Sequence, residues 1–475
     1  MRPLVFLLLA TLLLGCAWAL LVPPFQAPDE NAHVAYVQSL AERGELPGGG
    51  GQPQSSEQVA GALAANADQT AQLPDVKPEW STRAHGRWLE RSGRFDGHAR
   101  SDGGGANPAA PNPPLYYLWE LVPYKVASGG DLFARVTAMR VASVPFLLVT
   151  VLATWLLAGT VFGPNRLLQL AAASMPALLP MVTFVSASVT PDAALYAFWS
   201  LALWLGARLV LGRGGMRDVA AIAVVAGLAV LTKATSFALL PAVVVAVGVA
   251  AVRAGGGWRR IARPVAIAAA ALVVVLAPWY VYAHVNERPA SGQLAGAAAS
   301  SSVDVREFGS YVWQFYLPRL PFEARNGALG KYPQAYETWF KQGTAAFGWL
   351  ETRWPDWLYK VLFVLALAIA AGAVVTLVRQ RSSVDPMLLL FFATAAVVLV
   401  AGLHWNEYRL IQAGGALSNQ GRYLFPLISL VGLAAAAAVR ALPARWRVPL
   451  VGAGLGGLAL MQIFALVLVA QRFYA

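Results

Sequence analysis

The segment PPFQAPDENAH at residues 23–33 places two carboxylates and an imidazole directly after the first apolar stretch of the chain. If a helix begins here, Asp29 and Glu30 precede His33 by four and three residues, so the three side chains can share one edge. A carboxylate beside an imidazole at an apolar boundary can act as a general base. The alternative is an acidic helix cap, and the spacing decides neither this question nor which carboxylate would be the base.

A third carboxylate, Asp192, stands in the turn VTPDA, immediately before another apolar stretch. An acid at such a boundary is a second candidate for a functional residue. It could equally cap the helix that follows, because Asp is a favoured residue at helix starts. The sequence leaves both interpretations open for Asp192.

A polar turn, LTKATS at residues 231–236, interrupts two apolar stretches that are each short for a membrane span. Short spans broken by a polar turn indicate a turn that dips below the membrane surface. Lys233 would then lie at the depth of a lipid phosphate, with the hydroxyls of Thr235 and Ser236 at a helix start beside it. The alternative for Lys233 is a lysine that extends to the lipid headgroups.

Arg422 lies in the segment SNQGRYLFP at residues 418–426, where an apolar stretch begins. The helix dipole disfavours an arginine there unless an anion binds to it, and the forked guanidinium matches phosphate oxygens. We therefore expect Arg422 and Lys233 to bind one phosphate, with membrane anchoring as the alternative. Weaker candidates in the same predicted loop are His404, Glu407 and Arg409.

Metal binding has little support in the sequence. The single cysteine, Cys16, excludes an internal disulfide and a thiolate cluster. The histidines show no paired-ligand spacing; they are His33, His85, His98, His284 and His404. A Mg²⁺ or Ca²⁺ ion on Asp29, Glu30 and Asp192 is left open but is not specified, and we predict no metal site.

The composition predicts an integral membrane protein of the all-α class. Of the 475 residues, 57% are hydrophobic and 13% are charged, and the mean hydropathy is +0.55. The net charge of +12 is dispersed between apolar stretches, which indicates membrane topology and not a nucleic-acid surface. Residues 13–16 resemble a lipobox and residues 17–19 a signal-peptidase site, but residues 4–22 are long enough to span the membrane.

About eleven transmembrane helices are expected. They lie near residues 4–22, 137–162, 167–186, 193–211, 219–231, 236–252, 262–283, 357–378, 386–403, 423–439 and 449–469.

Basic residues mark one set of short connections as cytoplasmic. These connections and the N-terminus carry thirteen arginines against Asp218 and Asp385; the arginines are Arg2, Arg166, Arg213, Arg217, Arg253, Arg259, Arg260, Arg263, Arg379, Arg381, Arg440, Arg445 and Arg447. The N-terminus is then cytoplasmic, while the long polar segments 23–131 and 286–356 are extracytoplasmic. The first of them carries the acidic motif and a predicted surface helix from Asp29 to Gly44. No nucleotide-binding motif is present, so the chemistry is expected outside the cytoplasm.

Several segments carry a resemblance to a known family. They are residues 24–30 with His33, 112–117, 190–192, Lys233, 347–349 and 420–423. Together they resemble a family of bacterial multispanning membrane proteins of formerly unknown function, which is similar to the GT-C superfamily of glycosyltransferases. Enzymes of that superfamily use polyprenyl-phosphate sugars. The resemblance covers nearly the whole chain, and the acidic motif is its most specific part.

The resemblance implies an inverting glycosyltransferase in a bacterial plasma membrane, built as one GT-C-like domain over residues 1–475. Unlike several members of that family, this sequence is expected to have no soluble C-terminal domain after its last span. Its catalytic residues would be Asp29 and Glu30, with Asp29 as the base. Residues that position the acceptor or the sugar would be His33, Asp192 and Tyr116, and those that bind the donor phosphate would be Lys233, Arg422 and Tyr423. The partners would be the bilayer, a polyprenyl-phosphate-linked sugar and an envelope glycan, without a certain cofactor.

Two other classes of function compete with this interpretation. A flippase or transporter of lipid-linked sugars or solutes would place ionisable residues near the bilayer midplane, whereas the charged residues here gather at the ends of the apolar stretches. A scaffold in an envelope-assembly complex would tolerate replacement of Asp29.

Overall fold

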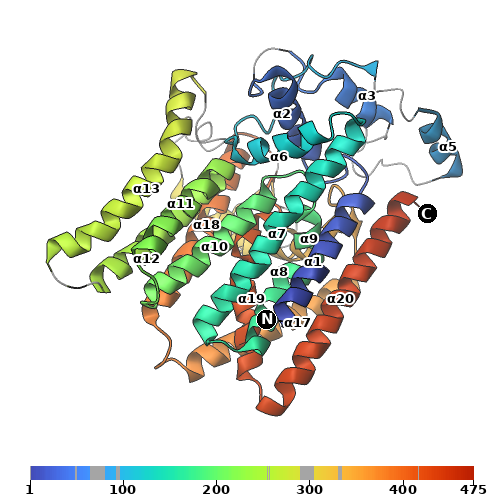
Figure 1. The fold of residues 1–475 in the computed structure, drawn as a ribbon. Coiled ribbons are helices and arrows are strands. Elements are labelled where there is room, and N and C mark those ends of the chain that lie inside the picture. Colours follow the sequence, from blue (N-terminus) through green and yellow to red (C-terminus); the bar gives the residue numbers. More distant parts are fainter. Residues whose placement is uncertain are drawn as a thin grey trace.

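The computed structural model of the protein describes residues 2–48, 51–64, 81–91, 97–253, 255, 257–288, 304–329, 334–415 and 417–474. Within these residues the chain is almost entirely helical. Long helices gather into one bundle, and a set of short helices lies at one end of it (Figure 1). The all-α class expected from the sequence is confirmed.

Nine helices in the described part of the chain have the length and the apolar composition needed to cross a membrane. They are α1 (Arg2–Leu21), α7 (Leu132–Phe162), α10 (Asp192–Val210), the continuous pair η3 and α12 (Ala234–Leu239 and Leu240–Arg253), α13 (Trp258–Val285), α17 (Asp356–Arg379), α18 (Pro386–Gln412), the continuous pair η5 and α19 (Gly421–Leu427 and Ile428–Ala441) and α20 (Ala444–Tyr474).

Two further segments account for the difference from the eleven spans expected. Helices α8 (Arg166–Leu178) and α9 (Pro180–Ser186) form one candidate span that bends by 57° at Leu179, which brings the number to ten. The bend falls at a proline, whose ring disfavours a helical conformation in the residue before it. Helix α11 (Met216–Thr232) has 17 residues, one fewer than the 18 residues that a candidate span requires.

The segment between α1 and α7 forms the set of short helices at the upper end of the bundle in Figure 1. They are α2 (Glu30–Arg43), α3 (Ser56–Ala64), α5 (Thr82–Arg91) and α6 (Leu115–Val126). The predicted surface helix corresponds to α2. It ends at Gly44, whose left-handed backbone (φ 71°) lets its N–H donate to the carbonyl of Leu40.

The second long polar segment contains α15 (Val305–Tyr316), the π-helical turn η4 (Tyr336–Lys341) and α16 (Gln342–Thr344). Two short antiparallel strands follow, β1 (Ala346–Phe347) and β2 (Thr352–Arg353). They hold a tight turn in which Gly348 adopts a positive φ of 64°.

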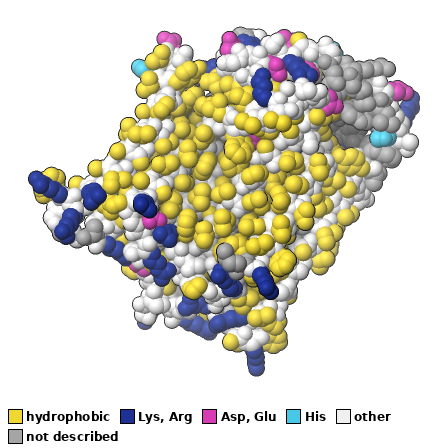
Figure 2. All heavy atoms as spheres, in the orientation of Figure 1, with side chains coloured by type: hydrophobic (Ala, Val, Ile, Leu, Met, Phe, Trp, Pro, Cys, Tyr) yellow, Lys and Arg dark blue, Asp and Glu magenta, His cyan; other side chains and the backbone are white. Residues whose placement is uncertain are grey.

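A broad band of hydrophobic side chains covers the face of the bundle seen in Figure 2, and Lys and Arg side chains gather along its lower edge. Acidic and basic side chains are mixed at the opposite end, where the short helices lie. Two of the few acids at the basic end are already paired: Asp218 lies 2.8 Å from Arg208, and Asp385 pairs with Arg253. The surface thus has the apolar belt and the uneven charge of a membrane protein.

Helix α10 lies at the centre of the core. In the most apolar 18-residue stretch of α10, 78% of the residues are buried, compared with 6% in the corresponding stretches of α13 and α17. Helix α10 packs against α7, α11, α12 and α18, so its first residue, Asp192, occupies a fixed position at the end of the bundle that bears the short helices.

Candidate active site

Asp29 precedes helix α2 but does not cap it. Its backbone is left-handed (φ 63°), a conformation that Asp tolerates better than most residues, and its side chain makes no capping hydrogen bond. The carboxylate instead accepts a hydrogen bond from the guanidinium of Arg422. Because 47% of this side chain is exposed, Asp29 is the accessible acid of the cluster. The capping alternative is therefore wrong for Asp29.

Arg422 lies in η5, only 4% exposed. Besides Asp29, its guanidinium reaches the carbonyl of Pro28 at 3.3 Å, and its Nε lies 3.7 Å from Oδ2 of Asp192. Among the described residues, neither that Nε nor that Oδ2 has a hydrogen-bond partner. A buried donor without a partner is costly, so Arg422 can still bind an oxygen atom of a ligand.

Asp192 and Lys233 form the second ion pair of the cluster. Nζ of Lys233 donates to Oδ1 of Asp192 at 2.6 Å, and the Asp192 side chain is 2% exposed. Asp192 is the first residue of α10, directly after the N-cap position at Pro191, and its Oδ2 has no hydrogen-bond partner among the described residues, so its side chain bonds to Lys233 and not to a backbone N–H of α10. Lys233 follows the last turn of α11, where the helix dipole favours a cation. The aromatic ring of Tyr423 faces both cations, with its centroid 5.0 Å from Lys233 Nζ and 5.4 Å from Arg422 Cζ.

His33 borders the same cluster from helix α2. Its Nδ1 lies 2.9 Å from the hydroxyl of Tyr117, which also accepts from the side-chain amide of Asn112 at 3.1 Å. Burial lowers the pKa of His33 to about 4, so the imidazole is neutral at pH 7. Loss of solvation alone would raise the pKa of Asp29, but the nearby positive charges, chiefly that of Arg422, and the hydrogen bond from Arg422 together hold that pKa below its ordinary value.

Glu30, predicted together with Asp29, has a different environment. Its carboxylate is fully buried and binds the guanidinium of Arg140 on α7, with 2.7 Å between Oε1 and Nε. It also accepts from the backbone N–H groups of Phe25 at 2.9 Å and Val189 at 3.1 Å. These contacts join the acidic motif, α7 and the turn before Asp192.

Tyr116 supports that same turn. Its hydroxyl accepts a hydrogen bond from the backbone N–H of Thr190 at 2.8 Å and lies 2.9 Å from the hydroxyl of Ser143. The neighbouring residue, Tyr117, is the one that contacts His33. Tyr116 and Glu30 therefore hold consecutive amides of the turn that carries Asp192.

The second polar segment also reaches the site. The indole N–H of Trp349 donates to the carbonyl of Phe25 at 2.9 Å, and the side chain of Gln342 accepts from the N–H of Gly421 at 3.3 Å. Gly421 must be glycine here, because a Cβ would lie 2.2 Å from the backbone nitrogen of Gly343. Thus the segments around Asp29 and Arg422 are each held by residues from 342–349.

The weaker candidates near Arg422 lie in helix α18 and not in the loop that we expected, because α18 continues to Gln412. His404 lies between the hydroxyls of Tyr311 and Tyr316, at 3.1 and 2.8 Å. Glu407 is buried and accepts hydrogen bonds from the N–H groups of Ser418 and Asn419. Glu407 therefore shapes the turn before Arg422.

Several important contacts were not predicted from the sequence. Arg140 is a charged residue within an apolar stretch of the sequence, and such a residue indicates a buried polar or oppositely charged partner. Tyr117 carried no signal that separated it from Tyr116. The described residues contain no group of three or more His, Cys, Asp or Glu able to hold a metal ion, so the ion left open at Asp29, Glu30 and Asp192 has no support in the geometry.

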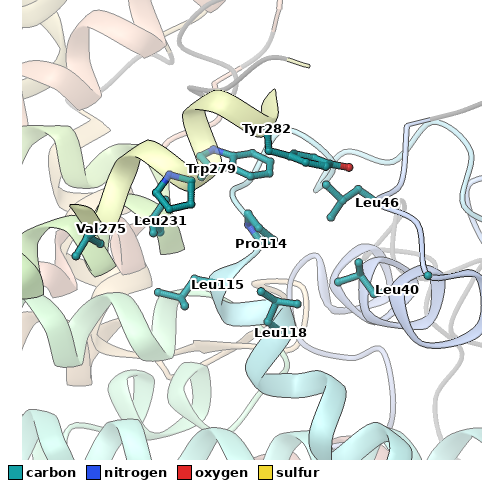
Figure 3. A pocket seen from close by; sticks show the side chains of 11 residues that line it. Leu40, Leu46, Pro114, Leu115, Leu118, Leu231, Val275, Trp279 and Tyr282 are labelled. Carbon is teal, nitrogen blue, oxygen red and sulfur yellow. The ribbon is translucent and has the colours of Figure 1, made fainter. Parts of the chain in front are cut away.

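An apolar groove lies beside the cluster, with a volume of about 390 Å³ (Figure 3). Its walls come from α2, α6, α11 and α13, and its lining residues are Leu40, Gly44, Leu46, Pro114, Leu115, Leu118, Leu231, Val275, Pro278, Trp279 and Tyr282. Leu231 precedes Lys233 by two residues, and Leu115 directly precedes Tyr116. The groove and the ion-pair cluster therefore share the ends of α6 and α11.

Comparison with solved structures shows the GT-C-like fold. The oligosaccharyltransferase AglB of Archaeoglobus fulgidus, in complex with an inhibitory peptide and a dolichol-phosphate, is 13% identical, with a TM-score of 0.51 over 99% of this chain and 56% of that one. ArnT of Cupriavidus metallidurans, bound to undecaprenyl phosphate, is 14% identical, with a TM-score of 0.47 over 99% of this chain and 74% of that one. The chain thus spans little more than half the length of AglB.

Comparison with curated protein sequences gave no match. Residues 12–431, in contrast, match the profile of a family described as predicted membrane protein (DUF2142). This match covers well over half of the sequence, and the chain therefore belongs to that family of membrane proteins.

Proposed function

We propose that this protein is an inverting glycosyltransferase that moves a sugar from a polyprenyl-phosphate donor to a hydroxyl of an envelope glycan or glycoconjugate. The observation that carries the proposal is the position of one accessible carboxylate, Asp29, on a buried arginine, Arg422, within the cluster that also holds Lys233. A base and two cations in one cluster suit the transfer of a sugar away from a phosphate.

Arg422 and Lys233 would bind the donor phosphate. Arg422 has a donor atom with no partner among the described residues, and the charge of Lys233 lies next to the end of the apolar groove at Leu231. A polyprenyl phosphate has one anionic end and a long apolar chain, so it matches a pair of cations at the end of a groove. The AglB structure of similar fold holds a dolichol-phosphate, which is a lipid of this class.

In the transfer, the acceptor hydroxyl loses its proton to Asp29 while its oxygen forms a bond to the anomeric carbon. The bond between that carbon and the phosphate oxygen breaks at the same time, and its electrons leave with the polyprenyl phosphate. The leaving group needs no proton, because fixed cations stabilise the charge that develops on it. Attack on the face opposite the phosphate inverts the anomeric configuration. Assistance by a general base typically contributes about 10²- to 10⁴-fold.

Binding of the donor would also prepare the base. In the ligand-free protein the guanidinium of Arg422 keeps the pKa of Asp29 low, which makes the carboxylate a weak base. A phosphate that draws the guanidinium toward itself weakens this ion pair, so the pKa of Asp29 rises. Asp29 would therefore gain basicity only when a donor is in place.

The remaining predicted residues would have supporting roles. Glu30 would position the acidic motif through Arg140, while Asp192 would hold Lys233 in place. His33 and Tyr116 would shape the acceptor side, and the ring of Tyr423 would support both cations.

The site would face the outside of a bacterial plasma membrane, with the N-terminus in the cytoplasm. This proposal rests on the basic edge of the bundle, opposite the site (Figure 2). The whole chain would then form a single domain, with residues 23–131 and 286–356 as its extracytoplasmic loops.

Purified protein and radiolabelled polyprenyl-phosphate sugars, each offered with and without an envelope glycan, test the proposal. We expect polyprenyl phosphate to be released, and label to appear in the glycan, only when the glycan is present. Movement of intact labelled lipid across vesicles without cleavage would instead identify a transporter. Neither cleavage nor movement would support a scaffold.

A further inference from the structure

A second carboxylic acid, Glu120, lies behind the site and is not used by the proposed reaction. It belongs to α6 and is fully buried. Its Oε1 accepts a hydrogen bond from the hydroxyl of Ser143 at 2.8 Å, and its Oε2 has no partner among the described residues. Burying a charged carboxylate with an unpaired oxygen costs free energy, and this cost falls when the group is protonated. A buried acid of this kind is therefore a candidate for a functional role.

Hydrogen bonds connect Glu120 to the turn that carries Asp192. Ser143 lies 2.9 Å from the hydroxyl of Tyr116, and that hydroxyl accepts from the N–H of Thr190 at 2.8 Å. The hydroxyl of Thr190 in turn lies 3.4 Å from the N–H of Asp192. The position of Asp192 thus depends on a chain of side chains that ends at Glu120.

Within the described part of the chain, no cation forms an ion pair with Glu120. The elements that pack against α6 are α2, α7 and α11. The charged and titratable side chains of these elements that face α6 or the site, together with Lys233 directly after α11, have other partners. These are Arg140 with Glu30, Arg135 with Glu57 and the ring of Tyr124, His33 and Tyr36 with Tyr117, Glu42 with Tyr124, and Lys233 with Asp192. The only titratable neighbour in the chain of hydrogen bonds is Tyr116. Burial accordingly raises the pKa of Glu120 to about 8.

We infer that Glu120 is a positioning residue that acts in its protonated, neutral form by ordering the turn of residues 189–192 through Ser143 and Tyr116. This inference rests on the proposed function for its link to donor binding. Glu30, paired with Arg140, accepts a hydrogen bond from the amide of Val189 directly. The amide of Thr190, in contrast, is held by Tyr116, which Ser143 connects to Glu120. The turn is therefore fixed at two consecutive amides, one bound directly by the carboxylate of Glu30 and the other bound by Tyr116 at the end of the chain of hydrogen bonds from Glu120.

Ionisation of Glu120 would place a charge in this apolar site without a partner. The carboxylate would draw in water and disturb the contact between Ser143 and Tyr116. The turn would then loosen, and Asp192 would hold Lys233 less firmly. The affinity for a donor phosphate should fall as the pH rises through the pKa of Glu120.

The test compares the full-length wild type with Glu120→Gln, which stays neutral and keeps an acceptor oxygen, and with Tyr116→Phe, which breaks the chain of hydrogen bonds. Glu42→Gln on α2 is the matched control, because Glu42 also contacts a tyrosine of α6. Two quantities are measured between pH 7 and pH 9: the affinity for undecaprenyl phosphate in detergent, and hydrogen exchange of the peptide that contains residues 189–192, corrected for its intrinsic rate.

Between pH 7 and pH 9 we expect the wild type and Glu42→Gln to lose about tenfold in affinity for undecaprenyl phosphate, since an uncompensated buried charge is costly. In both proteins the peptide that contains residues 189–192 should exchange faster at pH 9 than at pH 7. Glu120→Gln should match the wild type at pH 7 and keep its affinity and protection at pH 9. Tyr116→Phe should exchange fast at both pH values. Identical profiles for the wild type and Glu120→Gln would overturn the inference. Failure of the wild type to bind undecaprenyl phosphate would count against the proposed function, whereas the exchange profiles still decide the role of Glu120.

Discussion

Asp29 and Arg422 form an ion pair although 393 residues separate them in the chain. One partner precedes helix α2 of the first polar segment, and the other is the second residue of the 3₁₀-helix η5, which leads into α19. The pair joins an accessible carboxylate to a cation that is only 4% exposed. In the proposed mechanism a donor phosphate competes with Asp29 for Arg422, which would couple phosphate binding to the basicity of Asp29.

Arg422→Lys should weaken binding of undecaprenyl phosphate by about 10- to 100-fold. Lysine keeps the charge but lacks the fork of donors, and a hydrogen bond to a charged group contributes about 1.5–3 kcal/mol. Titration calorimetry in detergent measures the effect. Arg447→Lys is the matched control, because Arg447 donates to the backbone carbonyls of Leu442 and Arg440 and does not line the groove. Equal affinities of Arg422→Lys and the wild type would exclude Arg422 from phosphate binding.

Glu30→Gln should lower the free energy of unfolding by about 3–5 kcal/mol, because it leaves the buried guanidinium of Arg140 without its counter-charge. Replacing both residues, as Glu30→Gln with Arg140→Met, should cost less than the sum of the single changes. Unfolding in mixed micelles measures these values. Glu337→Gln breaks the exposed pair with Arg353 and should cost less than about 1 kcal/mol; a similar cost for both pairs would contradict the buried pairing.

The wild type should lose stability as the pH falls from about 6.5 to about 4. In this range the unfolded chain binds a proton at His33, whereas the folded protein, in which burial lowers the pKa of His33 to about 4, does not. The unfolded state is therefore favoured as the pH falls, by up to about 3 kcal/mol from this residue. His33→Gln should lose less stability than the wild type across the same range, and His98→Gln, at an exposed position, should follow the wild type. If His33→Gln also follows it, His33 is not buried as described.

Leu118→Trp should fill part of the apolar groove (Figure 3). We expect it to lower the affinity for undecaprenyl phosphate about tenfold, equivalent to losing the burial of about two methylene groups. The affinity for a phosphate with a short isoprenoid chain should change little. Val122→Trp, one turn further along α6 at a position that is 65% exposed, is the control. The groove would have no part in lipid binding if both variants bind as the wild type does.

The sequence predicted much of the fold because apolar length and local breaks determine it. Helix α2 begins and ends within one residue of its predicted bounds, since proline and Gly44 mark its limits. The local sequence also indicated the two basic candidates. Lys233 follows an unusually short apolar stretch, and Arg422 lies where another apolar stretch begins. Their shared position beside Asp192 could be expected only from the side of the membrane that each one faces.

Pairings between helices could not be predicted in the same way. Helical periodicity shows which residues share a face, but not which helix covers that face. The partner of Glu30 is Arg140, 110 residues further along the chain. Tyr116 and Tyr117 differ by one step along α6, yet one supports Thr190 and the other contacts His33. Only the packed structure distinguishes them.

The most direct test of the account is the rate of sugar transfer by Asp29→Asn. Asn keeps the shape of Asp and tolerates its left-handed backbone, so loss of the charge is the main change. Asp131→Asn is the matched control, because Asp131 is a true cap of α7 and accepts from the N–H of Ala134 at 2.7 Å. With radiolabelled polyprenyl-phosphate sugars and an envelope glycan, Asp29→Asn should transfer about 10²- to 10⁴-fold more slowly than the wild type, should still bind undecaprenyl phosphate, and Asp131→Asn should transfer at the wild-type rate. Transfer at the wild-type rate by Asp29→Asn would contradict the assignment of Asp29 as the base.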